Sequence, residues 1–349
     1  MWDSLIAWSQ NEFTHLPWRQ RRTLYGTLVS EIMLQQTTVS TVLNHFERFL
    51  KEFPHLKSLA QASEEELLIA WKGLGYYRRA KNLKAIAETV FKDHASEIPE
   101  DIELLMKIKG IGPYTANALV AIGMDKRGLA VDANLERVLS RYYGLKTAKG
   151  PKLQKQIQQL FLEKKICHEK DVSFRALNEA LMDLGRTICQ ANRVACELCP
   201  LKKKCVAFKA HAPLDYPMGA ALVSAAKAQD LSVTLVRVVV KKNDQVLAYQ
   251  KQKGEWLEGQ WEIPTFVIET NDPHFKQYPT FPEALAVEDL PLVKTGITKY
   301  NLENRILEMD NKTFKSLQSE RDFMWKTIHE RESNFSTATL KCLKKIKLL

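Results

Sequence analysis

Two glycines standing between two helical patterns constrain this chain most strongly. In "MKIKGIGPYTANALVAIG" (106–123), Gly110 and Gly112 separate two stretches that repeat apolar residues every three to four positions. Pro113 opens the second stretch, where it favours the first turn of a helix. Glycines let the backbone approach a partner closely, and amides at a helix start bind anions. The segment predicts two helices joined by a hairpin that can hold a phosphate; an ordinary tight turn is the alternative.

The charge of the chain is uneven along its length. The net charge is +10, and residues 1–225 carry 32 Lys and Arg against 24 Asp and Glu, whereas the remainder carries 19 against 17. A basic balance favours a polyanionic partner without identifying it. No apolar run reaches transmembrane length, and the start "MWDSLIAW" lacks the basic residues of a signal peptide. We therefore expect a cytoplasmic protein with no membrane partner.

The pattern of residues divides the chain into two parts. Residues 1–210 carry helical spacing throughout. Residues 211–230 contain two prolines and many small residues, so we interpret them as a linker. Beyond them, "SVTLVRVVVKKNDQVLAYQKQ" (232–252) reads as two strands joined by a polar turn, and "QWEIPTFVIE" (260–269) reads as a further strand. The segment 231–349 is therefore expected to be a smaller α+β domain.

Four of the six cysteines lie close together in the sequence. Cys189, Cys196, Cys199 and Cys205 follow the spacing C-x6-C-x2-C-x5-C. We expect no disulfides in a reducing cytosol, and four thiolates fit one metal centre. Zinc ribbons pair two C-x2-C knuckles and this segment has one, whereas a four-iron, four-sulfur cluster takes looser spacing. Spacing alone leaves zinc and iron–sulfur open.

A single carboxylate lies in an otherwise apolar helical segment, "SEIMLQQT" (30–37). Leu24, Leu28 and Ile32 recur every four residues and share a helix face, and Glu31 lies beside them. One interpretation is a half-exposed glutamate at the edge of the apolar stripe. The other is a desolvated carboxyl whose pKa is raised, so that it can deliver a proton near neutral pH.

A second carboxylate, Asp132, stands just before a helical pattern in "VDANLERVLSR" (131–141). Aspartate is a preferred N-cap residue, which is a sufficient structural reason for its presence. Capping does not exclude chemistry, because a carboxylate held at a helix start is also well oriented.

The hairpin, the aspartate twenty residues beyond it and the four cysteines together resemble the endonuclease III superfamily of DNA glycosylases. Within that superfamily, residues 15–210 resemble adenine DNA glycosylases of the MutY type. The stretches that carry the resemblance are "LPWR" (16–19), "SEIMLQQT" (30–37), "GLGYYRRAKNL" (73–83), "GIGPYTANA" (110–118), "VDANLERVLSR" (131–141), "NEALMDLG" (178–185) and the cysteines.

The resemblance implies a mainly α helix-hairpin-helix glycosylase domain with an iron–sulfur module, plus a C-terminal α+β Nudix-like domain. A six-helix barrel would cover about 24–131, and residues 1–23 with 132–210 would form the module. The Nudix-like domain, 231–349, resembles the family through "EGQWEIP" (258–264) and "LVKTGITKYNL" (292–302), without a Nudix-box array of glutamates.

The family implies a monofunctional enzyme that removes adenine mispaired with 8-oxoguanine, or guanine, from duplex DNA. It also implies a monomer associated with the nucleoid, with a [4Fe–4S] cluster on the four cysteines. Glu31 resembles the general acid, and Asp132 resembles the residue that stabilises or traps the oxocarbenium-like sugar. Tyr114 and Asn134 match positions that orient these two acids.

Further positions match residues of the family that contact DNA. Leu16, Trp18, Arg19 and Glu179 match the adenine pocket; Gln36 and Tyr76 match the wedge that fills the opened base stack; Gly110 and Gly112 match the DNA-binding hairpin. Where relatives direct a Phe-Ser-His loop toward 8-oxoguanine, this chain has Ile297, Thr298 and Lys299, so Thr298 is expected to keep the serine-like contact. Without the resemblance, core packing and surface charge would account for the pocket and wedge residues.

Two other functions remain as alternatives. A bifunctional glycosylase-lyase of the same superfamily carries a lysine where this chain has Tyr114, because Schiff-base chemistry requires an amine. A non-catalytic DNA-damage binder would share the charge, the hairpin and the cysteines, but it would not need Glu31 and Asp132 together.

Overall fold

The computed structural model describes residues 2–167, 172–219, 231–317, 321–328 and 334–349. The chain forms two compact units, one made of residues 1–62 with 78–224 and the other of residues 63–77 with 225–349. The predicted linker at 211–230 is described only as far as Gly219, and its remainder lies outside the described residues. No helix in the described ranges is both long enough and apolar enough to cross a membrane.

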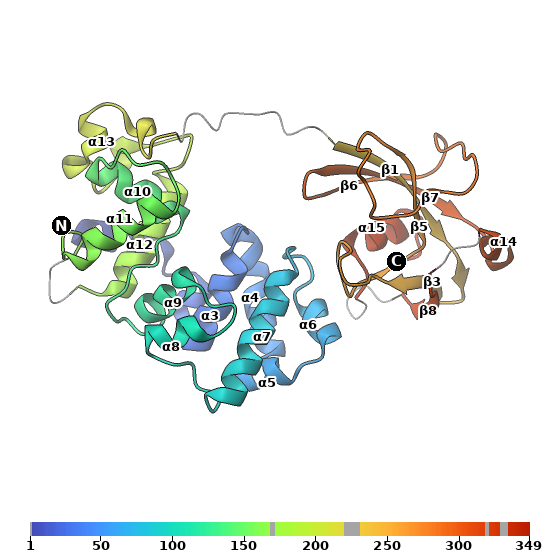
Figure 1. The fold of residues 1–349 in the computed structure, drawn as a ribbon, viewed down its shortest axis with the longest axis horizontal. Coiled ribbons are helices and arrows are strands. Elements are labelled where there is room, and N and C mark those ends of the chain that lie inside the picture. Colours follow the sequence, from blue (N-terminus) through green and yellow to red (C-terminus); the bar gives the residue numbers. More distant parts are fainter. Residues whose placement is uncertain (1, 168–171, 220–230, 318–320, 329–333) are drawn as a thin grey trace. The chain divides into compact units, whose positions relative to one another are not determined.

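The first unit is built from helices, as the spacing of apolar residues predicted. Figure 1 shows α3, α4, α5, α7, α8 and α9 gathered in one lobe of this unit and α10 to α13 in another. Its elements in chain order are α1 (Asp3–Phe13), α2 (Pro17–Gln20), α3 (Leu24–Leu34), α4 (Val39–Glu52), α5 (Leu56–Gln61), α7 (Arg78–Asp93), α8 (Ile102–Lys107), α9 (Pro113–Ala118), the π-helical turn η1 (Leu119–Gly123), α10 (Ala133–Tyr143), α11 (Pro151–Leu162), α12 (Phe174–Thr187), η2 (Cys196–Leu198), η3 (Lys202–Lys204), α13 (Val206–Lys209) and η4 (Pro213–Asp215).

The helix α3, which carries Glu31, is buried on all sides. Every residue from Gly26 to Met33 is buried, because α4, α7, α9 and η1 all pack against this helix. Thr23 caps its first turn by accepting a hydrogen bond from the Gly26 amide at 2.9 Å. The sequence predicted a single apolar stripe, and the structure instead buries every face of the helix between Gly26 and Met33. Glu31 therefore does not lie at an exposed edge.

The hairpin joins α8 to α9 as predicted, and Pro113 occupies the first turn of α9. Gly110 has φ +102, a backbone conformation that favours glycine. A Cβ on Gly110 would also lie 2.2 Å from Oδ1 of Asn82, whose Nδ2 donates to the Gly110 carbonyl at 3.2 Å. A Cβ on Gly112, in contrast, would meet nothing within 4 Å. Gly110 is thus required by the fold, while Gly112 leaves space on the outer side of the hairpin.

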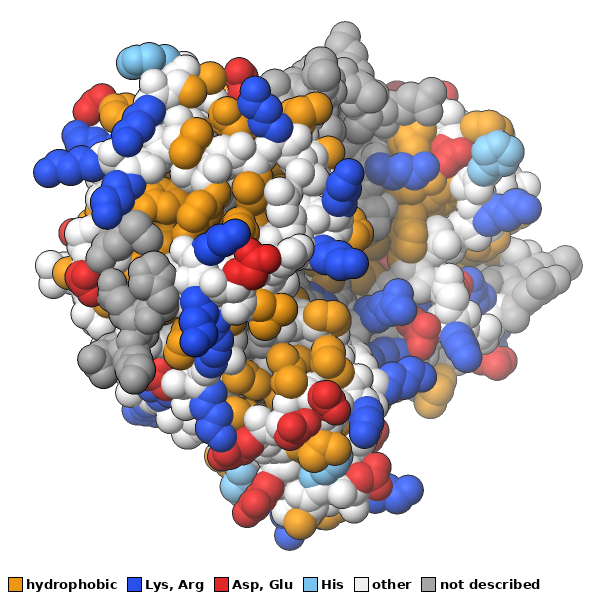
Figure 2. Space-filling model, turned by 60° about the vertical axis from the view of Figure 1, so that its left-hand side comes forward, with side chains coloured by type: hydrophobic (Ala, Val, Ile, Leu, Met, Phe, Trp, Pro, Cys, Tyr) orange, Lys and Arg blue, Asp and Glu red, His pale blue; other side chains and the backbone are white. Residues whose placement is uncertain are grey.

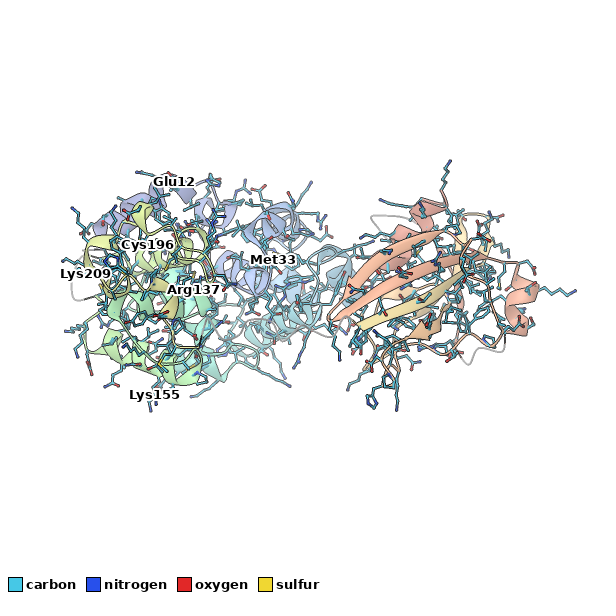
Figure 3. The ribbon with its side chains drawn as sticks, turned by 90° about the horizontal axis from the view of Figure 1, so that it is seen from above. Glu12, Met33, Arg137, Lys155, Cys196 and Lys209 are labelled. Atoms are coloured by element: carbon cyan, nitrogen blue, oxygen red, sulfur yellow. The ribbon has the colours of Figure 1, made fainter. Side chains whose placement is uncertain are left out.

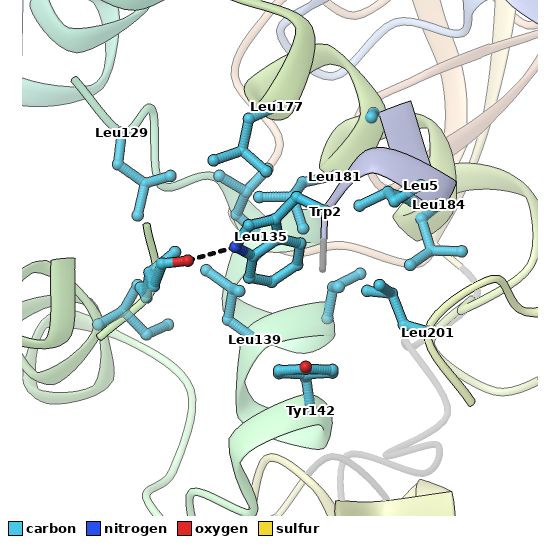
Figure 4. Packing of buried hydrophobic residues seen from close by; sticks show 14 of the residues in the cluster. Trp2, Leu5, Leu129, Leu135, Leu139, Tyr142, Leu177, Leu181, Leu184 and Leu201 are labelled. Carbon is cyan, nitrogen blue, oxygen red and sulfur yellow. Dashed lines mark hydrogen bonds between the residues drawn. The ribbon is translucent and has the colours of Figure 1, made fainter. Parts of the chain in front are cut away.

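A leucine-rich core holds α1 against α10 and α12. Figure 4 shows the Trp2 indole lying among leucines of α10 and α12, above the ring of Tyr142. Trp2 is 2% exposed, its ring centroid lies 5.4 Å from that of Tyr142, and its indole N–H donates to the Ile166 carbonyl. This core fixes α10 relative to α12, and so it fixes the helix start at which Asp132 lies.

The second unit contains two sheets and short helices. One sheet has the order β5-β1-β7-β6; the other has β2-β3-β4, with β8 paired to β3. Its elements are α6 (Glu64–Ala70), β1 (Leu231–Val239), β2 (Lys241–Lys242), β3 (Gln245–Gln250), β4 (Trp261–Glu262), β5 (Thr265–Thr270), β6 (Leu292–Ile297), β7 (Tyr300–Glu308), α14 (Asn311–Ser316), β8 (Met324–Thr327) and α15 (Thr337–Lys345). The α+β composition and the polar turn before β3 are as predicted. The first run of 232–252, however, is divided into β1 and β2, and only β2 pairs with β3, because β1 belongs to the other sheet.

A buried ion pair links the two sheets. Arg237 of β1 donates to Oε1 of Glu262 on β4 at 2.7 Å, and both side chains are at most 1% exposed. Burial would raise the pKa of Glu262, but the positive charges of Arg237 and Lys251 outweigh it and hold that pKa below its usual value. Removing Glu262 would leave the buried charge of Arg237 without its carboxylate partner.

Two expectations for this unit change. The strand predicted over 260–269 is divided into β4 and β5 by Ile263 and Pro264, because proline has no N–H to donate to a sheet. Ile297 is the last residue of β6, pairs with Tyr300 across the turn and packs against a buried hydrophobic cluster, so it is not a free loop residue. Only Thr298 and Lys299 form the exposed turn between β6 and β7.

Candidate active site

The Glu31 carboxyl meets the phenol of Tyr114 inside the helical unit. Glu31 is 6% exposed, and Tyr114, from the first turns of α9, donates its hydroxyl to Oε2 of Glu31 at 2.5 Å. The hairpin sets the position of α9, and the close packing of α9 on α3 brings the two side chains together. Residues separated by 83 positions in the sequence thus form one hydrogen-bonded pair.

The surroundings of Glu31 raise its pKa to about 7. Burial is the largest cause; the hydrogen bond from Tyr114 opposes it, and the negative charges of Asp132 and Glu179 raise the pKa further. Burial together with the charges of Glu31 and Asp132 also raises the pKa of Tyr114 well above its usual value, so the phenol stays protonated and keeps donating. Glu31 can therefore hold a proton at neutral pH and release it to a suitable base.

Asp132 caps α10, as the sequence predicted. Its Oδ1 accepts hydrogen bonds from the backbone amides of Asn134 and Leu135 at 2.9 and 2.8 Å. Its Oδ2 accepts a hydrogen bond from Nδ2 of Asn134 at 2.7 Å. Burial raises the pKa of Asp132, while these hydrogen bonds favour the ionised form and oppose that rise. The helix start therefore fixes the direction of this carboxylate.

A hydrogen-bonded chain connects Asp132 to the loop that carries the cysteines. Arg137 donates through Nη2 to Oδ1 of Asn134 and to the carbonyl of Gly185, each at 2.7 Å. Its Nε donates to the carbonyl of Cys189 at 2.7 Å. Figure 3 labels Arg137 on α10 and Cys196 on the neighbouring loop. The side chain of Asn134 is thereby held between Asp132 and Arg137.

A second charged cluster lies beside these acids. Glu179 accepts hydrogen bonds from both terminal nitrogens of Arg22, at 2.7 and 3.0 Å. Nε of Arg19 lies 3.6 Å from Oε1 of Glu179. Arg19 also donates to Asp183 at 2.8 Å, and Ser9 donates to the same carboxylate at 2.5 Å. The charge of Glu179 raises the pKa of Glu31 and that of Arg19 lowers it. The cluster therefore faces the same site.

The remaining residues expected at the pocket and the wedge lie in two different settings. Leu16 is 2% exposed, and the Trp18 ring packs edge-on against Phe46, so both contribute to the core. Gln36 and Tyr76 are exposed and have positive φ values of 57° and 47°. Non-glycine residues rarely adopt this conformation, and it occurs often at functional sites.

The four cysteines of the motif lie as free thiols in the loop from Cys189 to Cys205, and each is partly buried. Within the described ranges, no group of three or more His, Cys, Asp or Glu side chains is placed to hold a metal ion. Burial raises the pKa of Cys199 to about 12, and the other three thiols raise it as well. Nη1 of Arg141 lies 3.3 Å from Sγ of Cys189.

Basic side chains are spread over the molecular surface. Figure 2 shows Lys and Arg side chains spread over the helical unit between hydrophobic patches, with acidic side chains among them. Such a face suits a polyanionic partner.

Sequence reasoning missed several residues of the site: Arg22, Arg137 and Asp183. Arg22 lies in the charge run "RQRR", which reads as a solvated surface. Asp183 follows Glu179 by four positions on α12, and two acids on one face of an apolar helix were an available signal. Arg137 had no signal of its own, because its partners Gly185 and Cys189 lie about fifty residues away.

Comparison with known proteins agrees with this arrangement. Residues 29–164 match the family model described as "HhH-GPD superfamily base excision DNA repair protein". The chain is 36% identical over 206 residues to an adenine DNA glycosylase of Buchnera aphidicola, covering 58% of each chain. It is 35% identical to the human adenine DNA glycosylase, covering 58% of this chain and 38% of that protein. For the adenine DNA glycosylase of Mycobacterium tuberculosis the identity is 35%, covering 61% and 70%.

Solved structures show the same fold. A thermostable thymine-DNA glycosylase matches with a TM-score of 0.52 at 24% identity, covering 60% of this chain and 94% of that chain. A trapped endonuclease III–DNA covalent intermediate matches with a TM-score of 0.50 at 22% identity, covering 60% and 96%. The chain belongs to the HhH-GPD superfamily of base excision DNA repair proteins, in its branch of MutY-type adenine DNA glycosylases. The matches span about half the length of the Buchnera relatives.

Gly185 should be required for the position of Asn134. A Cβ on Gly185 would lie 2.5 Å from Cβ and 3.1 Å from Cα of Asn134. Gly185→Ala is therefore expected to lower the free energy of unfolding by about 1–3 kcal/mol, because the α10 backbone must move away. Urea denaturation of the full chain measures this change.

The matched control adds Asn134→Gly, which removes the Cβ that the new methyl group meets. In a double-mutant cycle, Gly185→Ala should cost less in the Asn134→Gly background than in the wild type. Equal costs in both backgrounds would show that the contact between Gly185 and Asn134 does not limit the packing of α10.

Proposed function

We propose that the chain is a monofunctional adenine DNA glycosylase that removes adenine opposite 8-oxoguanine, or guanine, from duplex DNA. The observation that carries this proposal is the buried carboxyl of Glu31, which is hydrogen-bonded by Tyr114 and has a pKa of about 7. Adenine is a poor leaving group, and an acid that stays protonated at neutral pH can correct this by protonating the base. The names of the curated relatives support adenine as the base.

The proposed reaction begins when the adenine leaves the base stack. Because Tyr114 donates its hydrogen bond to Oε2 of Glu31, the proton lies on Oε1, which donates it to N7 of the adenine. The glycosidic bond then breaks, its electron pair passes to the base, and positive charge develops on the sugar. Asp132, with its direction fixed by Asn134 and the α10 amides, stabilises that charge or forms a bond to it before water completes the hydrolysis.

The phenol at Tyr114 also favours simple hydrolysis over lyase chemistry. A lyase of this superfamily needs an amine at the hairpin to form a Schiff base with the sugar. Tyr114 offers a protonated hydroxyl that is already bound to Glu31. In our proposal Tyr114 therefore orients the acid and does not attack the sugar.

We place the adenine pocket beside Glu31, lined by Leu16, Trp18, Arg19 and Glu179. The support is electrostatic, because the charges of Arg19 and Glu179 both affect the pKa of Glu31. Arg22 holds both oxygens of Glu179, so that carboxylate has a fixed orientation. A fixed acceptor beside the acid could receive the exocyclic amino group of adenine.

We assign recognition of 8-oxoguanine to the C-terminal unit as a Nudix-like domain, through the turn between β6 and β7. Thr298, with φ +52, and Lys299 form the exposed tip of this turn. The tip offers a hydroxyl and an ammonium group, whereas Ile297 packs inward. Hydrogen bonding by Thr298 would read the base, and Lys299 would contact a phosphate.

We propose that Cys189, Cys196, Cys199 and Cys205 hold a [4Fe–4S] cluster. The donor set fits: four partly buried thiols lie on one loop and affect one another's pKa, with Arg141 beside Cys189. These four residues would supply the four thiolate ligands that such a cluster takes. When bound, the cluster would hold the loop rigid and keep the lysines of "PLKKK" available to phosphates.

Replacing Glu31 tests the proposed function. Glu31→Gln keeps the shape and loses the proton, so we expect binding to a duplex with adenine opposite 8-oxoguanine and at least about a hundredfold slower release of adenine. Single-turnover assays on this duplex, on adenine opposite guanine and on thymine glycol measure the free base. Glu47→Gln, an exposed glutamate on α4, is the matched control.

The substrates distinguish the competing functions. Release of thymine glycol in preference to adenine would indicate the lyase-type relative. Tight binding with no release of any base by the wild-type chain would indicate a non-catalytic binder. Near wild-type adenine release by Glu31→Gln would refute the role of Glu31 as the acid.

The cofactor proposal predicts the composition of the purified chain. We expect iron and labile sulfide at about four of each per chain. Cys199→Ala should lose both and weaken DNA binding, whereas Cys342→Ala, in the other unit, should keep them. One zinc and no sulfide in the wild-type protein would contradict the proposal.

A further inference from the structure

The C-terminal end of α3, immediately after Glu31, is closed by a single arginine from α7. The last carbonyls of a helix have no partners within the helix. Arg79 donates through Nη1 to the carbonyls of Ile32 at 3.0 Å and Met33 at 2.7 Å, and also to that of Gln35. A cation is also favoured by the dipole at this end of a helix.

The same guanidinium reaches past the helix end into the following turn. Nη2 of Arg79 donates to Oγ1 of Thr37 at 2.8 Å. Arg79 therefore binds the residue before Gln36 and the residue after it. The amide of Thr37 also donates to the Leu34 carbonyl at 3.3 Å, so the turn is closed on itself.

Gln36, between these two anchor points, has a backbone that needs support. Its φ is +57°, and such a conformation costs a non-glycine residue on the order of 1–3 kcal/mol unless its surroundings impose it. Its side chain is exposed, so packing of that side chain does not supply the support. The contacts of Arg79 on both sides do supply it. The result is a polar side chain presented to the outside at a fixed place beside the acid-bearing helix.

We propose that Arg79 is a positioning residue for base extrusion. Its guanidinium group holds the turn of residues 35–37 in place, so that Gln36 can enter the base stack as the adenine leaves it. The inference rests on the proposed glycosylase function. Arg79 does not touch the reacting atoms. It acts through Gln36 on the opening of the DNA and leaves the proton transfer by Glu31 unchanged.

The geometry requires arginine and not merely a positive charge. Two separate nitrogens of one rigid plane reach the helix end and the turn at the same time. A lysine has a single ammonium group, which can bind either the carbonyls at the end of α3 or the hydroxyl of Thr37, but not both. Arg79 also lies three positions after Tyr76 in the sequence, the other residue that matches the wedge and that has positive φ.

The test separates extrusion of the base from chemistry on it. Arg79→Lys in the full chain is assayed under single-turnover conditions on two duplexes: adenine opposite 8-oxoguanine, and the same adenine opposite an abasic-site analogue, where it has no pairing partner. We expect about a tenfold loss of rate on the first duplex and less than about twofold on the second, because the loss corresponds to about one charged hydrogen bond. Arg78→Lys, the exposed neighbour, is the matched control.

A double-mutant cycle tests whether Arg79 acts through Gln36. Arg79→Lys should add no further loss in a Gln36→Ala background. Equal losses of rate on both duplexes, or additive losses in the cycle, would overturn the proposal, because a general structural defect affects both substrates alike. Thermal unfolding of each variant shows how far the fold is retained.

A readout that does not depend on excision keeps the inference separate from the proposed function. In a duplex with 2-aminopurine in place of the adenine, unstacking increases its fluorescence. We expect the wild type to increase it and Arg79→Lys to increase it less. If the wild type excises no adenine, the proposed function fails, while this difference still decides the role of Arg79. Equal fluorescence with both proteins would overturn the inference.

Discussion

The site depends on the removal of one carboxyl group from water. Glu31 stands on a helix whose middle turns are buried on every side, and Tyr114, which donates a hydrogen bond to it, comes from the helix that follows the glycine hairpin. Desolvation keeps the proton on Glu31 near neutral pH, and the phenol fixes which oxygen carries it. The hairpin thus has two roles in our account, because the turn that presents Gly112 to the outside also sets the position of Tyr114.

The second acid is also buried, but it has more hydrogen-bond donors around it. Asp132 lies at a helix start and accepts three hydrogen bonds, which favour a carboxylate. The same Asn134 that binds it is held by Arg137, whose other contacts are carbonyls of α12 and of the cysteine loop. Burial raises the pKa of both carboxyl groups, and at Asp132 three hydrogen bonds oppose that rise. Two carboxyl groups in different surroundings form the arrangement that glycosidic chemistry uses.

The sequence was informative where the structure is local, and less so where distant segments meet. The hairpin, the cap at Asp132 and the α+β tail each follow from a few adjacent residues. The complete burial of α3 did not, because it comes from α4, α7 and α9 folding around that helix. Arg22 and Arg79 looked like surface charge, since their carboxylate and carbonyl partners lie 157 and about 45 positions away. Pro264 is the local signal that divides residues 260–269 into two strands, and the prediction of a single strand overlooked it.

The central claim is that the fold keeps Glu31 protonated, and the titration of this one carboxyl tests it most directly. Infrared difference spectra of the wild type and Glu31→Gln, recorded across the pH range in the full chain without DNA, isolate its carboxyl band. The account predicts a midpoint near pH 7. A midpoint near 4.5, the ordinary value for a glutamate, would contradict it.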